Sequence, residues 1–302
     1  MPRVSVLMPT YNTREDYLRE AIQSIRCQSF SDFELLILDD GSANCAEIRE
    51  IALSFADPRI YFSANETNTG ISPARNKLIA MARGEYLAVC DHDDISMPER
   101  LQKQVEFLDR NPETGVVGGA IFKMSRGKII EYPKDNKALE ELLLVDCVVE
   151  HPLAMIRKSV LQRTGVKYEE EFTPAEDYAL WCRLIGKTRF ANLPDVLLRY
   201  REHQESATHA MSANMREATT RIMAFARSAN PVLWNRVQKR IIDINRYCIF
   251  GFLPLMTVRT QGKKTKYLLF GCLPVLVSRR ASKSQGIVSR RAWWALRGRK
   301  AM

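Results

Sequence analysis

The sequence of 302 residues lacks features that mark several large classes of protein. Its seven cysteines are odd in number and include no Cys-x-x-Cys pair. This argues against a disulfide framework and a zinc ribbon and favours a reducing compartment. The longest apolar run, YLLFGCLPVLV, has 11 residues and contains a proline, whereas a membrane-spanning helix needs about 20. The opening segment, MPRVSVLMPTYN, reads as a strand and a turn rather than as a signal peptide. We therefore expect a cytoplasmic protein.

Acidic residues are absent after Asp243. Residues 204–302 contain 19 Lys+Arg and 3 Asp+Glu, whereas residues 1–203 contain 26 Lys+Arg and 32 Asp+Glu. The net charge of +10 therefore conceals an acidic front and a basic tail. Such an asymmetry indicates that the two parts meet different partners.

Apolar runs and helical periodicities alternate in the first hundred residues. The runs predicted as strands are VSVLM (4–8), FELLILDD (33–40), RIYFSA (59–64) and GEYLAVC (84–90). Between them lie amphipathic segments, and Ser72 and Pro73 are placed as the N-cap and first residue of one helix. Repeated strand–helix–strand units imply a mostly parallel sheet covered on both faces. In such sheets ligands bind at the carboxyl ends of the strands.

Acidic side chains crowd together where two of these strands end. Asp91, Asp93 and Asp94 fall within four positions, and the pair Asp39-Asp40 ends a neighbouring strand. Aspartates favour turns, so a turn cluster is one interpretation. The alternative is a Mg²⁺ or Mn²⁺ site, because D-x-D spacing in an extended chain directs two carboxylates the same way.

The pattern loosens beyond residue 100. MPERLQKQVEFLDRNP is predicted to be a helix, VVGGAIFKM and KIIEYP a hairpin, and DYALWCRLIG an amphipathic helix. Residues 206–247 read as helical and basic, with a break at Asn230-Pro231. The tail repeats Phe-Gly-x-Leu-Pro at Phe250 and Phe270, each time followed by a cluster of cations.

Six motifs in order resemble the family-2 inverting glycosyltransferases, which have an α/β GT-A fold. They are SVLMPTYN, LILDDGS, GISPARN, GEYLAVCDHDD, AEDYALWCRL and YREHQES. The resemblance covers about two-thirds of the chain. It predicts a GT-A domain over residues 1–205, with a mostly parallel Rossmann-like sheet, followed by a basic helical or amphipathic extension over residues 206–302.

The resemblance implies a nucleotide-binding role for the first two strand ends. Pro9, Thr10 and Tyr11 would line the base pocket, and Asp40 would accept a hydrogen bond from the uracil or ribose. Arg75 matches an arginine that lies near the nucleotide, and its permanent charge suits that role. A salt bridge from Arg75 to an acid of the site is the structural alternative.

The resemblance also implies a metal and a general base. Asp91 would lie near the ribose or sugar, Asp93 would ligate Mn²⁺ or Mg²⁺, and Asp94 would orient Asp93 or touch the sugar. His92 occupies the variable position of the motif and is not expected to be a ligand. His203 would complete the metal site unless it is structural.

The predictions for the acceptor side are based on the AED motif. Asp177 is the predicted general base, with Glu176 beside it as a substrate contact, although acids also favour the first turn of a helix. Trp181 would stack on an acceptor sugar unless it is a core residue. His151 occupies a position near the acceptor side in many relatives.

The basic tail has several interpretations. Its repeats and the terminal SRRAWWALRGRK suit an anionic membrane surface, because arginine-flanked tryptophans anchor at interfaces. The helical part, residues 206–247, is alternatively a solvated bundle. Nucleic acid is not an expected partner, since no known binding module is evident. We therefore expect peripheral association with the inner face of the cell membrane.

Together these features predict a metal-dependent glycosyltransferase that uses a nucleotide sugar, with a UDP-sugar expected. Its acceptor would be a glycan or lipid-linked glycan in bacterial surface polysaccharide synthesis. The alternative is a catalytically inactive relative that binds nucleotide sugars or acts as a membrane scaffold. A nucleotidyltransferase is disfavoured because no Gly-rich, basic triphosphate loop lies near the N-terminus.

Overall fold

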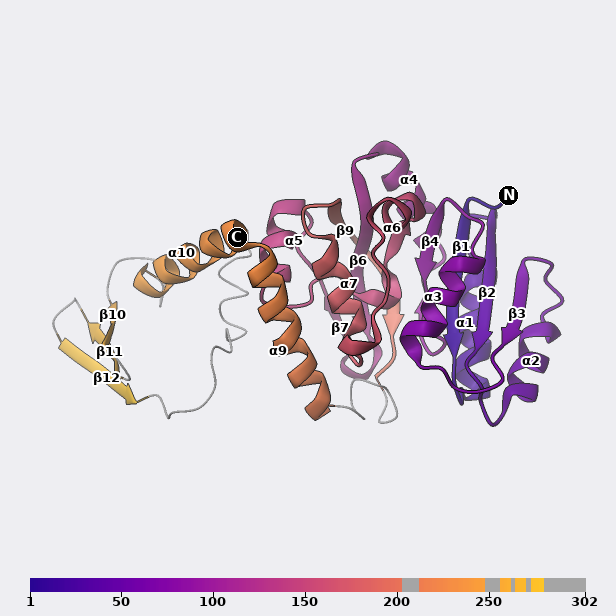
Figure 1. Ribbon diagram of the computed structural model, residues 1–302, viewed down its shortest axis with the longest axis horizontal. Coiled ribbons are helices and arrows are strands. Elements are labelled where there is room, and N and C mark those ends of the chain that lie inside the picture. The colour runs from indigo at the N-terminus through magenta and orange to yellow at the C-terminus, as the bar shows by residue number, and fades with distance from the viewer. Residues whose placement is uncertain (203–211, 248–255, 262–263, 270–272, 280–302) are drawn as a thin grey trace. The chain divides into compact units, whose positions relative to one another are not determined.

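The computed structural model (Figure 1) describes residues 1–202, 212–247, 256–261, 264–269 and 273–279. By its internal contacts the chain divides into two compact units, Met1–Ala226 and Arg227–Met302. The predicted boundary between residues 205 and 206 stays a prediction.

The first unit begins with four parallel strands in the order β3-β2-β1-β4. The strands are β1 (Val4–Thr10), β2 (Phe33–Asp39), β3 (Ile60–Ala64) and β4 (Tyr86–Val89). The helices that connect them are α1 (Glu15–Arg26), α2 (Cys45–Ser54) and α3 (Ile71–Met81). This arrangement confirms the predicted strand–helix units, and it brings the carboxyl ends of the four strands to one edge of the sheet.

The sheet continues from β4 through β8, β6 and β9 to β5. These strands are β5 (Ile95–Ser96), β6 (Thr114–Lys123), β7 (Lys128–Ile130), β8 (Met155–Arg157) and β9 (Arg189–Tyr200). The helices are α4 (Arg100–Arg110), α5 (Asn136–Leu143), α6 (Lys158–Thr164) and α7 (Glu176–Leu184). β6 and β7 form the predicted hairpin. β8 is antiparallel to both of its neighbours, whereas β9 runs parallel to β6.

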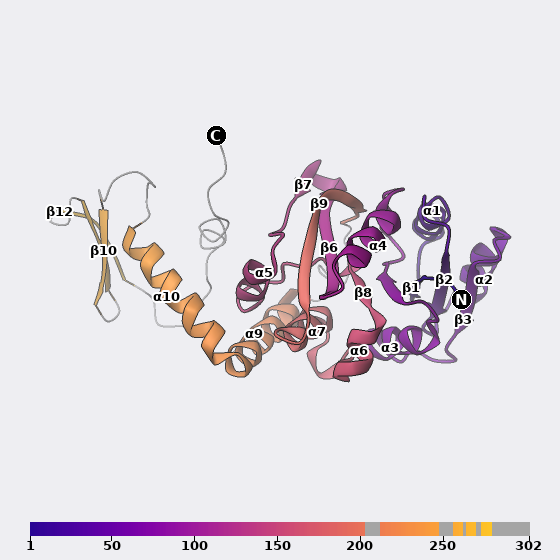
Figure 2. The ribbon, with the colours of Figure 1, turned by 90° about the horizontal axis from the view of Figure 1, so that it is seen from above.

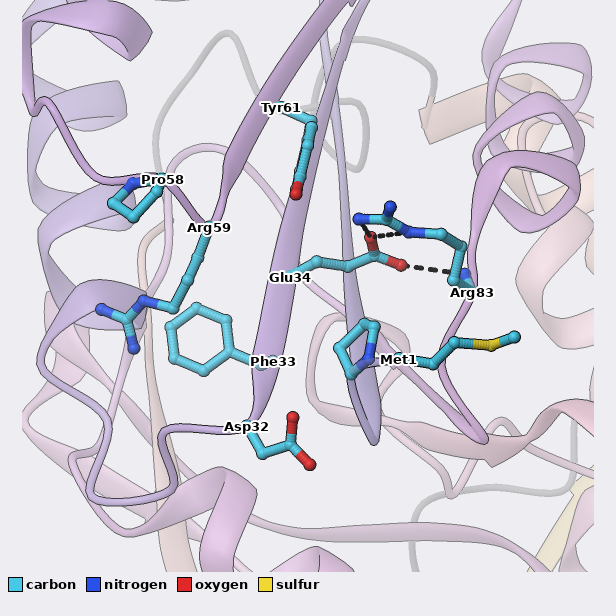
Figure 3. A pocket seen from close by; sticks show the side chains of 9 residues that line it. Met1, Asp32, Phe33, Glu34, Pro58, Arg59, Tyr61 and Arg83 are labelled. Carbon is cyan, nitrogen blue, oxygen red and sulfur yellow. Dashed lines mark hydrogen bonds and ion pairs between the residues drawn. The ribbon is translucent and has the colours of Figure 1, made fainter.

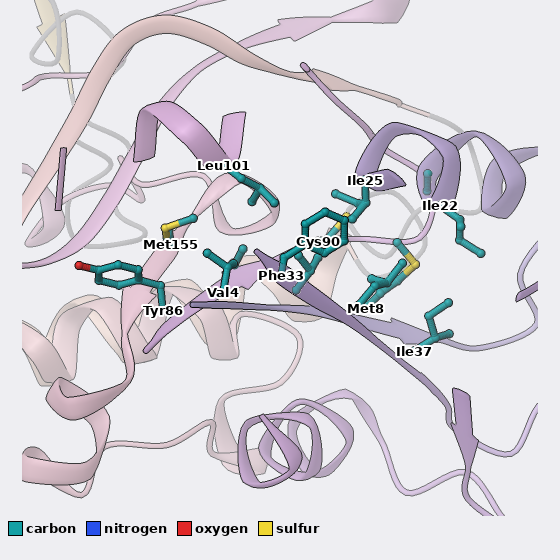
Figure 4. Close-up of a cluster of buried hydrophobic side chains, with 14 of the residues drawn as sticks. Val4, Met8, Ile22, Ile25, Phe33, Ile37, Tyr86, Cys90, Leu101 and Met155 are labelled. Carbon is teal, nitrogen blue, oxygen red and sulfur yellow. The ribbon is translucent and has the colours of Figure 1, made fainter. Parts of the chain in front are cut away.

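Helices cover both faces of the sheet, as Figure 2 shows for α1 and α4 on one side and α3 and α6 on the other. Apolar residues of α1, α2 and α4 pack on β1, β2 and β4 in one core (Figure 4). Leu18, Ile22 and Ile25 of α1 are fully buried there. Burial of this apolar surface holds the sheet in place, at roughly 25 cal/mol per Å².

The start of α3 differs from the sequence prediction. The helix begins at Ile71, and its N-cap is Gly70 with φ of 93° rather than Ser72. Pro73 then lies inside the first turn, where backbone N–H groups have no helical partner and proline is tolerated. The cap lies earlier because the N–H of Gly70 donates to the Asp40 carboxylate at 2.9 Å.

The second unit contains most of the basic tail. α9 (Ser212–Ala229) runs into it and α10 (Pro231–Tyr247) follows, so the predicted break at Asn230-Pro231 is confirmed. β10 (Met256–Gln261), β11 (Lys264–Leu269) and β12 (Leu273–Arg279) form an antiparallel sheet, which was not predicted. The overlooked signal is TVRTQGKKTKY, in which β-branched residues stand on both sides of a glycine, a sequence typical of a hairpin. Among the described residues, no helix is long and apolar enough to span a bilayer.

Candidate active site

Hydrogen bonds join the loops that follow β1 and β2. Thr10 Oγ1 donates to Asp39 Oδ1 at 3.2 Å, and Ser42 donates to the same carboxylate through its backbone N–H and its hydroxyl. The N–H of Asn12 donates to Ser42 Oγ at 2.8 Å. Thr10 and Asp39 are buried. Asp39 is therefore a structural residue that fixes the two loops against each other.

Asp40 holds the loop between β3 and α3. Its carboxylate accepts hydrogen bonds from the side chains of Asn65 and Thr69 and from the backbone N–H groups of Thr69 and Gly70, at 2.7–3.1 Å. Burial disfavours the charged form, but these donors outweigh it, so the pKa of Asp40 is lowered. Much of the acceptor capacity of Asp40 is thus used within the protein, and its predicted contact with the nucleotide stays a prediction.

Gly41 allows the same loop to approach closely. Its φ is 73°, and a Cβ there would lie 2.4 Å from the carbonyl carbon of Thr67. Any other residue would force these backbones apart. The DDG sequence therefore joins the ends of β2 and β3 rather than simply presenting acids to a ligand.

Arg75 of α3 connects two motifs that lie far apart in the sequence. Its Nη1 donates to Glu176 Oε1 at 2.5 Å, and its Nη2 lies 3.6 Å from Asp91 Oδ1. The guanidinium also lies 5.4 Å from the centroid of the Tyr168 ring. Arg75 is 9% exposed. The salt-bridge alternative for Arg75 is therefore present in this structure, and it draws α3, the end of β4 and the start of α7 together.

Asp91, Asp93 and Asp94 form an acidic loop directly after β4. Each offers a carboxylate oxygen, and these oxygens lie within 4.8 Å of one another. Burial, followed by the charges of Asp93 and Asp91, raises the pKa of Asp94 well above its usual value. Burial also raises the pKa of Asp91, although the charge of Arg75 opposes this. Unneutralised carboxylates this close repel one another.

The donor set of the acidic loop fits a divalent cation. Its ligands are all carboxylate oxygens, the type preferred by Mg²⁺ and Mn²⁺. Asp94 accepts the backbone N–H of Arg201 through Oδ1 at 2.8 Å, but its buried Oδ2 has no hydrogen-bond partner among the described residues. A buried oxygen without a partner is costly unless an ion or another ligand occupies it.

Asp177, at the start of α7, has a pKa that the structure raises to near neutrality. Burial, and next the charge of Glu176, raise its pKa from 3.8 to about 7, while Arg75 opposes the shift. Tyr178 donates its backbone N–H to Asp177 Oδ1 at 2.6 Å. A carboxyl group with a pKa near neutrality is suited to accept and release a proton.

One aromatic prediction on the acceptor side needs correction. Trp181 is completely buried, so its ring has no free face on which a sugar could stack, and it is a core residue. His151 is also buried, and its Nε2 lies 2.8 Å from the Tyr168 hydroxyl. Burial, followed by the charge of Arg75, holds the pKa of His151 well below its usual value. The rings of His151 and Trp181 lie with their centroids 6.0 Å apart, and Tyr168, the partner of His151, lies against Arg75.

The remaining predicted residues fall into three groups. Tyr11 is 49% exposed at the carboxyl end of β1, whereas Pro9 and Thr10 are buried behind it. His92 has a buried Nδ1 without a hydrogen-bond partner among the described residues, and its exclusion from the ligand set stays a prediction. His203 lies outside the described residues.

Glu150 is a residue near the site that the sequence analysis missed. Its carboxylate accepts a hydrogen bond from the Tyr132 hydroxyl, and burial raises its pKa. Its charge acts on Asp94 and Asp177. No motif marks Glu150, because it lies in the connection between α5 and a short helical turn and is brought near these acids only by the fold.

A hollow of about 500 Å³ lies at the opposite end of the sheet (Figure 3). It is lined at the amino ends of β2 and β3 by residues that include Phe33, Arg59, Tyr61 and Arg83. The guanidinium of Arg83 pairs with Glu34 at 2.6 Å, and that of Arg59 pairs with Asp57 at 2.7 Å. Because ligands of parallel sheets bind at the carboxyl ends, this hollow is separate from the candidate active site.

Comparison with known sequences places the chain in a known family. A family model described as glycosyl transferase family 2 matches residues 5–165. The chain belongs to glycosyltransferase family 2, and the α/β GT-A fold predicted from its motifs is confirmed.

Similar proteins come from archaea and bacteria. An uncharacterized glycosyltransferase of Methanocaldococcus jannaschii is 34% identical over 208 residues, which cover 66% of this chain and 71% of the relative. The putative glycosyltransferase EpsE of Bacillus subtilis is 32% identical over 68% of this chain and 75% of its own length. An uncharacterized glycosyltransferase of Rickettsia felis is 28% identical over 72% of this chain, but only 37% of that longer protein is matched.

Solved structures share the fold at low sequence identity. Residues 1–349 of S. aureus TarS in complex with UDP-GlcNAc superpose with a TM-score of 0.65 at 20% identity, covering 81% of this chain and 74% of that chain. The mannosyltransferase PcManGT from Pyrobaculum calidifontis, in complex with GDP-Man and Mn²⁺, superposes with a TM-score of 0.56 at 20% identity, covering 84% and 77%.

Proposed function

We propose that the protein is a metal-dependent, inverting glycosyltransferase that transfers a sugar from a nucleotide sugar to a glycan or lipid-linked glycan. The expected donor is a UDP-sugar, and the expected process is bacterial surface polysaccharide synthesis. The observation that carries this proposal is the junction of Arg75 with Asp91 and Glu176. It gathers three motifs of the family at the carboxyl end of the sheet.

The donor would bind where β1 and β2 end. Tyr11 offers an exposed ring for a base, with Pro9 and Thr10 behind it. The loop held by Asp40 would form the adjacent wall, and Arg75 would lie near the nucleotide. TarS and PcManGT bind UDP-GlcNAc and GDP-Man, which supports a nucleoside diphosphate sugar as the class of donor.

The acidic loop would hold Mn²⁺ or Mg²⁺ through Asp93, with Asp91 near the ribose or sugar and Asp94 supporting Asp93 or the sugar. When bound, such a cation stabilises the negative charge that grows on the departing nucleoside diphosphate. His203 remains a proposed further ligand. The complex of PcManGT with Mn²⁺ supports a cation of this kind.

Asp177 would act as the general base. It accepts the proton of the acceptor hydroxyl while that oxygen attacks C1 of the sugar, and the bond from C1 to the diphosphate breaks on the opposite face. Glu176 is held by Arg75 through a contact of 2.5 Å, whereas no arginine bonds to Asp177, whose pKa is raised to about 7, so Asp177 is our choice for the proton acceptor. Glu176 would then position Arg75 and contact substrate through Oε2, which has no hydrogen-bond partner among the described residues.

The proposed acceptor and the proposed location are both inferred from the basic extension. In the sheet of the second unit, Arg259 stands opposite Lys266 and Lys264 opposite Arg279. These four cationic residues therefore occupy paired backbone positions in one region of the sheet. We propose that this region meets the anionic inner face of the cell membrane, where a lipid-linked glycan would be presented.

The activity is tested with UDP-glucose, UDP-GlcNAc and GDP-mannose in the presence of Mn²⁺. We expect one of them to raise the melting temperature and to be hydrolysed slowly without an acceptor, and chelation should stop both effects. Asp93→Asn should lose the Mn²⁺-dependent stabilisation, because it removes a charge from the proposed metal site.

Asp32→Asn is the matched control, since it removes an exposed carboxylate at the far end of the sheet. Full turnover by Asp93→Asn would contradict the metal assignment. Tight donor binding without turnover of any donor or acceptor would favour the inactive, sugar-binding relative.

A further inference from the structure

Arg201 follows β9 directly, but its contacts reach the acidic loop. Its backbone N–H donates to Asp94 Oδ1 at 2.8 Å, and its guanidinium Nε donates to the backbone carbonyl of Asp93 at 2.9 Å. One residue therefore binds two consecutive members of the proposed metal loop. None of the motif-based roles includes Arg201.

The other end of the same guanidinium is anchored on α1. Nη2 pairs with the carboxylate of Glu20, and the guanidinium carbon lies 4.3 Å from the centroid of the Tyr17 ring. The Arg201 side chain is only 17% exposed. Arginine suits such a position, because its planar group can donate in several fixed directions while stacking on an aromatic ring.

Arg100 holds the two ends of the acidic loop together, but its side chain makes none of the contacts described above for Asp93 and Asp94. The fully buried guanidinium of Arg100 donates to the Val89 carbonyl at 2.5 Å and to Ser96 Oγ at 2.9 Å. These acceptors lie before and after the loop. Between them stand three carboxylates whose mutual repulsion favours a splayed arrangement. The bond from Arg201 to the Asp93 carbonyl restrains the tip of the loop.

We propose that Arg201 is a positioning residue that holds the Asp93–Asp94 segment against α1 in the geometry that binds the metal and the diphosphate. Arg201 acts through the main chain of Asp93, and Glu20 and Tyr17 hold its guanidinium in place. The functional part of this inference rests on the proposed metal-dependent transfer, whereas restraint of the loop can be measured without any ligand.

Arg14 provides a matched control. Its guanidinium lies 4.4 Å from the same Tyr17 ring and pairs with Asp16 at 2.7 Å. Neither of these contacts involves the acidic loop. Arg14→Ala and Arg201→Ala therefore each remove one arginine from the same aromatic ring, but only the second removes the bond to Asp93.

The first measurement is amide hydrogen exchange over residues 90–97 in the full, metal-free chain. We expect Arg201→Ala to raise exchange in this segment several-fold without lowering the melting temperature appreciably. Arg14→Ala should match the wild type. Unchanged exchange in Arg201→Ala, or an equal rise in Arg14→Ala, would overturn the proposal.

The second measurement is Mn²⁺ binding in the presence of UDP. Arg201→Ala should weaken Mn²⁺ binding about tenfold. The affinity of Arg201→Lys should lie between those of Arg201→Ala and the wild type. Glu20→Gln should also weaken Mn²⁺ binding. The double variant Arg201→Ala/Glu20→Gln should bind as Arg201→Ala does, because residues that act as one unit are not additive. Additive losses would overturn the role of Glu20 as the anchor.

These readouts separate the inference from the proposed function. Faster exchange in Arg201→Ala together with weaker Mn²⁺ binding supports both. Faster exchange in Arg201→Ala, with no Mn²⁺ binding by the wild type, supports the restraint of the loop and overturns the metal site. Wild-type Mn²⁺ affinity in Arg201→Ala overturns the positioning role even if the metal site is real.

Discussion

Glu176 and Asp177 are adjacent carboxyl groups in very different surroundings. Glu176 hydrogen-bonds to Arg75, whereas the hydrogen bond to Asp177 comes from the N–H of Tyr178. Burial, and next the charge of Glu176, raise the pKa of Asp177, whereas the charge of Arg75 lowers it. Neighbouring acids in different surroundings commonly divide the work of an active site.

The raised pKa of Asp177 predicts a pH profile for transfer. Below pH about 7 the carboxyl group is mostly protonated and cannot accept the proton of the acceptor. The value of kcat/KM should therefore rise with pH along a limb of apparent pKa about 7 and level off above it. Asp177→Asn should lower kcat by about 10²–10⁴-fold while retaining donor binding, measured by initial rates and by calorimetry.

The same shift has a consequence for stability. A carboxyl group with a raised pKa stabilises the folded state when protonated, and this contribution disappears as the pH rises from about 4 to about 7. Asp177→Asn should therefore melt higher than the wild type at pH 8 and no higher at pH 4. A flat difference between these pH values would show that Asp177 titrates normally.

At the scale of elements, Asp40 determines how β2, the following loop and α3 meet. Asp40→Asn replaces one carboxylate oxygen with an amide donor that faces other donors. We expect a loss of unfolding free energy on the order of 2 kcal/mol, since hydrogen bonds to charged groups contribute about 1.5–3 kcal/mol each. Urea unfolding of the ligand-free protein measures this change.

The pH dependence of the stability difference between the wild type and Asp40→Asn provides a control for this prediction. Its pKa is lowered, so its contribution is present above pH 3.8 and is lost as the pH falls below that value. The difference between the wild type and Asp40→Asn should shrink in acid. If Asp40→Asn weakened donor binding without any change in stability, Asp40 would be a ligand contact rather than the support of a loop.

Elements with local signals could be predicted from the sequence. The strands and helices up to residue 110 follow apolar periodicity, and Pro231 marked the start of α10. The sequence also predicted that the acids after β2 and β4 lie at the same edge of the sheet, because the carboxyl ends of parallel strands meet at one edge. Trp181 could not be assigned, since its surroundings come from distant segments that no local pattern specifies.

The bonds within the site could not be predicted for the same reason. Arg201 lies 107 positions from Asp94 in the sequence, and Arg75 lies 101 from Glu176. Spacing along the chain carries no information about such pairs. The prediction misplaced the N-cap of α3 because the partner that selects Gly70 is Asp40, which follows β2 and lies far from Gly70 in the sequence.

At the scale of the whole molecule, charge divides the chain into an acidic front and a basic tail. Replacing Arg259, Lys264, Lys266 and Arg279 by Gln should weaken binding to vesicles containing phosphatidylglycerol. Each cation near an anionic surface contributes about 1 kcal/mol, so the binding constant should fall well over tenfold. Co-sedimentation over a range of lipid concentrations measures it.

The control replaces four exposed cations of the first unit by Gln, namely Arg110, Lys128, Lys134 and Lys137. It changes the net charge by the same amount and should bind vesicles as the wild type does. Equal loss in both variants would mean that only the total charge matters. No loss in either variant would remove the proposed membrane role of the sheet.

The close approach of Gly41 to Thr67 limits how the donor preference of this protein can be engineered. The backbone there leaves no space for a side chain, so a mutant library that varies position 41 would mostly yield unfolded chains. Tyr11 is 49% exposed at the end of the neighbouring strand, so we expect its replacement to cost little stability. A search for variants with a new nucleotide preference should therefore hold Gly41 and Asp40 constant and randomise Tyr11.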